Sequence, residues 1–220
     1  MNTIKTAGAP VFLYGVNYET YAQIRDEPHN EKLRLTYYDG TLEIMAPADY
    51  RHEWGSYRLS MIVNAYAFVF EIEAEGALST TFRNGVPGQP EGAGKEPDLS
   101  FYFADHAEHV RNKETLDLKI DPAPDLWIEV DNKGSSNGSL PLYVEPGVPE
   151  VWRDWTRRRK LWFGSLRNGS FVEIQRSLCL PKVTPNIVLE MIDEARKRGQ
   201  TAWDIWMRNW MDTSLRNAND

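Results

Sequence analysis

Two apolar segments carry acidic side chains at positions where an ordinary buried β-strand would carry none. Asp98 comes directly before the apolar run 99–103, Glu129 lies inside the run 126–130, and Asp131 follows that run. An ionised carboxylate is costly to bury without a partner, and a divalent cation is a common partner for several carboxylates. The sequence therefore predicts a Mg²⁺ (or Mn²⁺) site with Asp98, Glu129 and Asp131 as its ligands.

The chemistry that such a site favours is hydrolysis of a phosphodiester bond. That reaction needs a cation that polarises a phosphoryl oxygen and acidifies a water molecule, and carboxylates on rigid strands are suitable ligands for it. Glu129 and Asp131 could face the same ion, because residues two apart in a strand share a face. Two plainer interpretations stay open: Asp98 caps a turn, and Glu129 forms a buried ion pair with an arginine.

A hairpin is predicted upstream of these carboxylates. Segments 33–37 and 41–45 flank Asp39 and Gly40, a pair that is typical of a tight turn between two antiparallel strands. Glu43 then lies in the middle of the second strand.

A long helix is predicted directly after the hairpin. Asp49 is a suitable N-cap, and from Trp54 onward the apolar residues recur every three or four positions, which gives the helix one core-facing stripe. His52 lies in the first turn, where backbone donors favour anions such as a substrate phosphate, although a histidine there is more often a surface residue. Glu53 falls on the polar stripe, which faces either solvent or a cleft.

The rest of the chain alternates between strand and helix patterns. Strands are predicted at 78–83, 126–131, 150–155, 160–163 and 171–175, and helices at 104–119, 185–195 and 202–211. Arg157, Arg158, Arg159 and Lys160 form a dense basic cluster between two of these strands, and either a solvated turn or a base-recognition element fits it equally well.

Composition limits the classes of protein that fit. The 220 residues carry a formal net charge of −7, which argues against a simple DNA-coating role but not against a metal-dependent nuclease, whose active site is necessarily acidic. The single Cys179 excludes an intrachain disulfide and a cysteine-based zinc cluster. No apolar run is long enough for a signal peptide or a membrane span, so a cytoplasmic protein without membrane contact is expected.

The residues named above carry a family resemblance. The chain contains, in order, the motifs D-G-T-L-E-I-M-A-P, H-E, E-P-D-L-S-F-Y, P-A-P-D-L-W-I-E-V-D and G-V-P-E-V-W-R. Over about residues 33–174 this set resembles the Uma-two type of restriction endonucleases in the PD-(D/E)xK nuclease superfamily. The resemblance implies an α/β fold, with a mixed sheet flanked by helices, in a restriction-endonuclease-like core with an N-terminal hairpin extension. It also implies that Asp98 and Glu129 are the metal-binding pair, and that His52 and Glu43 match the family's histidine and hairpin carboxylate.

The sequence departs from the superfamily pattern at the lysine. That pattern places a lysine two residues after the glutamate, to orient and activate the attacking water, whereas this chain has Asp131 there. Lys133 is the first candidate to replace it, and Lys95, three residues before Asp98, is the second. Asp131 could instead bind a second ion.

These observations lead to one preferred function and two alternatives. The preferred one is a Mg²⁺-dependent endonuclease acting on DNA, in which Asp98, Glu129, His52 and Lys133 are catalytic. The alternatives are a catalytically inactive nuclease fold that binds DNA or another partner, and a metal-dependent hydrolase of another phosphoester.

We expect an N-terminal extension at 1–32, a nuclease-like core at 33–176 and a C-terminal helical segment at 177–220 packed on the same domain. The last segment carries Trp203, Trp206 and Trp210 at helical spacing, and this apolar surface makes a homodimer plausible.

Overall fold

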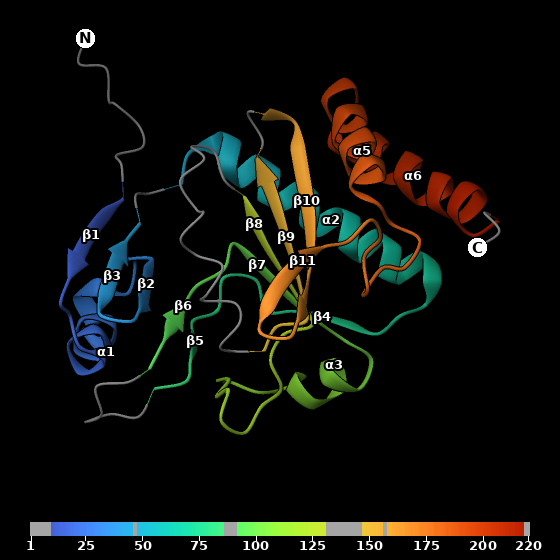
Figure 1. Cartoon of the computed structure of the whole chain (residues 1–220). Helices are drawn as coiled ribbons and strands as arrows, with labels where there is room; N and C mark the ends of the chain where they lie inside the picture. The colour runs from blue at the N-terminus through green and yellow to red at the C-terminus, as the bar shows by residue number, and fades with distance from the viewer. Residues whose placement is uncertain (1–9, 46–47, 86–91, 131–146, 156–157, 218–220) are drawn as a thin grey trace, which may run out of the picture.

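The computed structural model describes residues 10–45, 48–85, 92–130, 147–155 and 158–217. Its strands form two sheets: one of six strands in the order β11-β10-β9-β8-β7-β4, and one of five in the order β1-β3-β2-β6-β5 (Figure 1). In the larger sheet β8 and β9 run parallel and the other neighbours run antiparallel, so the sheet is mixed. The predicted α/β class is confirmed, and the N-terminal hairpin belongs to the second, smaller sheet.

The six-stranded sheet brings the two acidic motifs together. Its strands, in sheet order, are Ser170–Glu173, Lys160–Arg167, Glu150–Trp155, Leu126–Val130, Leu99–Phe103 and Ala74–Gly76. β7 pairs antiparallel with β8, with Leu99 opposite Ile128. Continuing this register by one residue sets Asp98 opposite Glu129, so both carboxylates come from neighbouring chain segments at one end of the strands.

The five-stranded sheet contains the predicted hairpin. Its strands, in sheet order, are Val11–Tyr14, Thr41–Ile44, Leu35–Tyr38, Gly94–Lys95 and Phe82–Arg83. Asp39 and Gly40 both have positive φ, the backbone conformation that a two-residue hairpin turn requires. Helix α1 (Tyr18–Asp26) covers this sheet, and Tyr21 stacks on Tyr37 with ring centroids 5.2 Å apart. A short 3₁₀ turn, η1 (Pro28–Asn30), leads from α1 to β2.

Helix α2 (Tyr50–Phe70) begins where the sequence predicts it, because Asp49 accepts a hydrogen bond from the backbone N–H of His52. Its apolar stripe packs on one face of the six-stranded sheet together with α5 (Pro185–Lys197), α6 (Gln200–Trp210) and the π-helical turn η4 (Met211–Leu215) (Figure 1). Helix α3 (Ala104–Val110) packs in a smaller apolar cluster with Tyr102 and Trp127, on the opposite face of that sheet.

Two predicted elements are shorter than expected. The strand predicted at 78–83 is reduced to β5, because Leu78 has a positive φ and Thr80 N–H donates to Ala77 in a turn. The helix predicted at 104–119 ends at Val110, and Asn112 then takes a positive φ that no helix continues through.

Three features bear on the remaining expectations. Among the described residues, no helix is both long and apolar enough to cross a membrane.

The expected segment boundaries stay predictions. Strand β1 comes from the segment 1–32, expected as an N-terminal extension, and it pairs with β3. Trp203 is fully buried, and Trp206 and Trp210 are partly buried against the core, so much of the apolar surface expected for a homodimer is used within the chain.

Candidate active site

Asp98 and Glu129 form a close, buried pair of carboxylates at the end of β7 and β8. Both residues are less than a tenth exposed. They lie on the face of the larger sheet that also carries Trp127, whose ring contacts Phe82 of the smaller sheet. The pair therefore lies where strands of the two sheets approach each other. The sequence predicts this pairing.

Asp98 is held by three donors. Arg34 Nη2 lies 2.6 Å from Oδ1, and His52 Nε2 lies 3.1 Å from Oδ2. The backbone N–H of Val130 also donates to Oδ2 at 2.7 Å. Burial raises the pKa of Asp98, but the hydrogen bond from His52, the charge of Arg34 and the Val130 donor outweigh it and lower the pKa to about 2.

Glu129 has a different environment. The Lys95 ammonium lies 3.3 Å from Oε1. Burial and the charge of Asp98 raise the pKa of Glu129, and Lys95 and Arg34 counteract this shift without cancelling it. The charged form of Glu129 is therefore less stable here than in water, so an additional positive charge would stabilise it.

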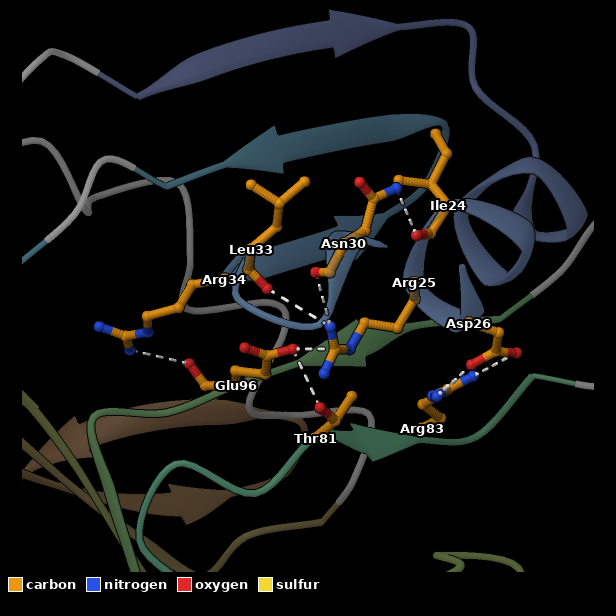
Figure 2. Close-up of polar contacts among 9 residues, drawn as sticks. All are labelled: Ile24, Arg25, Asp26, Asn30, Leu33, Arg34, Thr81, Arg83 and Glu96. Atoms are coloured by element: carbon orange, nitrogen blue, oxygen red, sulfur yellow. Dashed lines mark hydrogen bonds and ion pairs between the residues drawn. The ribbon is translucent and has the colours of Figure 1, made fainter. Parts of the chain in front are cut away.

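Arg34 was not anticipated as a site residue. It comes directly before β2, and Nη2 also donates to the backbone carbonyl of Glu96 at 3.4 Å (Figure 2). The sequence did contain a sign of its role: Arg34 is a charged residue inside the predicted strand 33–37. It lies on the same face of that strand as Thr36, because residues two apart share a face. Glu43 of β3 is opposite Thr36 and so shares this face, but among the described residues it makes no ion pair.

His52 occupies the first turn of α2, as predicted, and turns inward. Burial lowers the pKa of His52, but the hydrogen bond and charge of Asp98 outweigh it, so the pKa is raised. Glu53 Oε1 lies 3.7 Å from the other ring nitrogen, Nδ1, and the Glu53 side chain is largely exposed. Glu53 is therefore at the rim of the site rather than among its buried carboxylates.

The structure places only one of the two candidate lysines. Lys95 of β6 is buried and contacts Glu129, whereas Lys133 lies outside the described residues. Asp131, the third predicted metal ligand, lies outside them as well. Within the described ranges, no group of three or more His, Cys, Asp or Glu side chains is arranged to hold a metal ion.

The donor set of the site nevertheless fits a hard divalent cation. Asp98 and Glu129 offer carboxylate oxygens side by side on adjacent strands, and Glu129 is in an environment that disfavours its own charge. Mg²⁺ retains several water ligands and often uses one or two protein carboxylates, which is the number that this pair offers.

Comparison with known proteins agrees with the motifs. The model of the Uma2 family, described as "Putative restriction endonuclease", matches residues 18–191. The chain belongs to the Uma2 family. The Uma2 match includes both strand ends of the site together with Arg34, His52 and Lys95.

Among solved structures, one that is similar to this Uma2 chain is titled a putative nuclease belonging to DUF820 from Anabaena variabilis. The two share 13% sequence identity with a TM-score of 0.49, over 71% of this chain and 89% of that one. No curated protein matches the sequence.

Proposed function

We propose that this chain is a Mg²⁺-dependent endonuclease that hydrolyses phosphodiester bonds in DNA. The observation that carries the proposal is the opposed pair of Asp98 and Glu129, with Lys95, His52 and Arg34 around it. Membership of the Uma2 family supports a nuclease. Cations that surround a buried carboxylate pair are suited to a reaction in which negative charge develops on a phosphate.

Asp98 and Glu129 would hold the Mg²⁺, and by sequence Asp131 is a further ligand. When bound, the cation polarises a phosphoryl oxygen and acidifies a water molecule. The two strands hold the carboxylates in fixed positions before substrate arrives, and this preorganisation is how a protein contributes most to such a reaction.

Lys95 is the residue we assign to the role of the missing superfamily lysine. Its Nζ is 3.3 Å from Glu129 Oε1, so it lies beside the carboxylate that the usual lysine accompanies. There it can orient the attacking water and stabilise negative charge on the phosphate. Lys133 stays a sequence prediction for the same role.

His52 and Arg34 supply the remaining positive charge. Because its pKa is raised, His52 carries a proton more readily than an exposed histidine and can donate it to the leaving oxygen. Arg34 keeps a planar guanidinium beside Asp98, where it can bind a phosphate oxygen.

A cleavage assay tests this function. Supercoiled plasmid and linear DNA are incubated with the protein in Mg²⁺, in Mn²⁺ and in EDTA. We expect cleavage that requires the cation and falls by at least about 100-fold in Asp98→Asn and in Glu129→Gln. Asp26→Asn is the matched control, since Asp26 forms an exposed ion pair with Arg83 outside the site. Cleavage by both site variants at the parent rate would refute the proposal.

A second function is favoured by one observation. Asp98 and Glu129 already have cationic partners, as expected of a binding protein that keeps the fold without turnover. In that case the protein binds DNA but does not cut it in the presence of any cation. The Asp98 and Glu129 variants then bind DNA like the parent and also do not cut it.

A further inference from the structure

A pocket of about 420 Å³ opens between the start of α2 and helix α5. Tyr50, Arg51, Trp54 and Arg196 line it. Among the described residues, its lining therefore combines two guanidinium groups and two aromatic rings with no carboxylate, on a chain whose net charge is −7. Such a local positive site on an acidic protein suits an anion that also has an aromatic part.

The four side chains are positioned for different contacts. Tyr50 is 83% exposed, so its ring is open to a stacking partner. Trp54 is partly buried, and the Arg196 guanidinium lies 5.8 Å from its ring centre, which holds that arginine at the pocket wall. Arg196 also donates to Asp193 on its own helix at 2.9 Å. Arg51 is exposed.

The pocket and the active site share one helical turn. Arg51 and His52 are consecutive, so their Cα atoms are about 3.8 Å apart, yet His52 turns toward Asp98 while Tyr50 and Arg51 line the pocket. Side chains two apart on a helix point to nearly opposite sides, so a DNA strand with a phosphate at Asp98 and Glu129 would reach Tyr50 by crossing the start of α2.

We propose that this pocket binds an unpaired nucleotide of the DNA strand that is cleaved. The base stacks on Tyr50, and the flanking phosphates contact Arg51 and Arg196. Aromatic rings combined with cationic groups are how proteins bind single-stranded nucleic acid without reading its sequence, whereas a paired base inside a duplex has both faces covered. The inference rests on the proposed nuclease function and specifies its substrate class: DNA with a single-stranded segment.

Binding measured without cleavage tests this inference. Fluorescence anisotropy in EDTA at low salt compares a labelled single-stranded oligonucleotide with a blunt duplex of the same sequence. We expect tighter binding of the single strand than of the duplex. Tyr50→Ala should raise the dissociation constant for the single strand roughly 5- to 150-fold. Tyr50→Phe should keep the affinity because it keeps the ring, and Arg51→Ala should weaken binding and make it less salt-dependent.

The matched control is Phe68→Ala, which removes another exposed ring further along α2. The inference is overturned if the duplex binds as tightly as the single strand, if Tyr50→Ala binds like the parent, if Phe68→Ala weakens binding as much, or if neither oligonucleotide binds. The two proposals fail separately. Plasmid cleavage that depends on Asp98 but not on Tyr50 refutes the pocket alone, whereas Tyr50-dependent binding without cleavage by any cation refutes the nuclease alone.

Discussion

At the scale of single residues, the site is defined by how its carboxylates are neutralised. Asp98 has donors on both oxygens, and its pKa is lowered; Glu129 has the Lys95 ammonium at one oxygen, and its pKa is raised. The two neighbouring carboxylates therefore differ in how readily each loses its proton, because their pKa values are shifted in opposite directions.

Removing the Lys95 charge tests the role assigned to it. We expect Lys95→Met to lower the single-turnover cleavage rate by about 100-fold, because among the residues that the structure describes no other lysine places its ammonium group beside Glu129. Affinity for Mn²⁺, measured by isothermal titration, should stay the same or increase, since a competing cation is removed. If Lys95 served only to stabilise the fold, its replacement would instead lower both the cleavage rate and the affinity for Mn²⁺. Lys119→Met is the control, because Lys119 is exposed and donates to the Gly85 carbonyl outside the site.

Asp121 gives a pH prediction that is independent of catalysis. The backbone N–H of Asp117, the ammonium of Lys113 and the ring of His109 lower the pKa of Asp121 to about 2. A pKa below the unfolded value of about 3.9 means that Asp121 stabilises the fold above that pH and loses this effect as the pH falls toward 2.

Urea unfolding of the parent and of Asp121→Asn at several pH values measures this effect. We expect the variant to be less stable at pH 7, and the difference from the parent to shrink between about pH 4 and pH 2. A difference of equal size at pH 7 and pH 2.5 would contradict the assignment.

At the scale of elements, the start of α2 connects stability to catalysis. Asp49 caps the turn that holds His52 toward Asp98 and Tyr50 toward the pocket. Asp49→Ala should therefore lower the free energy of unfolding by about 1 kcal/mol and also reduce cleavage. Thermal unfolding and the plasmid assay measure the two effects.

A second helix supplies the control for this prediction. Asn17 caps α1 in the same way and accepts a hydrogen bond from Thr20 at 2.8 Å. Asn17→Ala should cost similar stability and leave cleavage unchanged. Equal losses of activity in both variants would mean that the position of His52 has no part in the reaction.

At the scale of the whole molecule, a buried ion pair joins the N-terminal helix to the strand that carries Lys95. Arg25 Nε lies 3.1 Å from Glu96 Oε1, and Thr81 donates to the same oxygen at 2.9 Å (Figure 2). Arg25 also donates to the Leu33 carbonyl at 3.4 Å, beside Arg34. This network connects α1 and the hairpin to the chain that leads into Asp98.

Breaking that pair should destabilise the protein strongly. We expect Arg25→Met to cost about 3–5 kcal/mol, because Glu96 is left buried without its partner, and the double variant Arg25→Met with Glu96→Gln to cost less. Arg83→Met, which breaks the exposed pair with Asp26, should cost about 0–1 kcal/mol. Denaturant midpoints that are equal for Arg25→Met and Arg83→Met would contradict the importance of the buried pair.

Much of the architecture follows from local sequence patterns. The Asp39-Gly40 turn, the Asp49 cap and the apolar runs around Glu129 each depend on a few neighbouring residues, and the structure has the hairpin, α2 and β8 at those places. The meeting of Asp98 with Glu129 was also predictable, because Asp98 precedes one apolar run, Glu129 lies inside the other, and two such runs are most simply joined as adjacent strands.

His52 and Lys95 were candidates from the sequence, but Arg34 and the contacts of the cations with the pair were harder to predict. Arg34, directly before β2, and Lys95, in β6, reach the pair from the other sheet, and β6 has only two residues with no recognisable alternation. Their contacts depend on how the two sheets meet, which is set by packing between distant segments such as Phe82 and Trp127.

The proposed function requires that Asp98 and Glu129 together hold one divalent cation. Anomalous X-ray diffraction from a crystal soaked in Mn²⁺ tests it most directly. We expect one strong peak within about 2.5 Å of a carboxylate oxygen of each residue, and no such peak in crystals of Glu129→Gln. A peak elsewhere, or none while Arg34 and Lys95 keep their contacts with the two carboxylates, would contradict it.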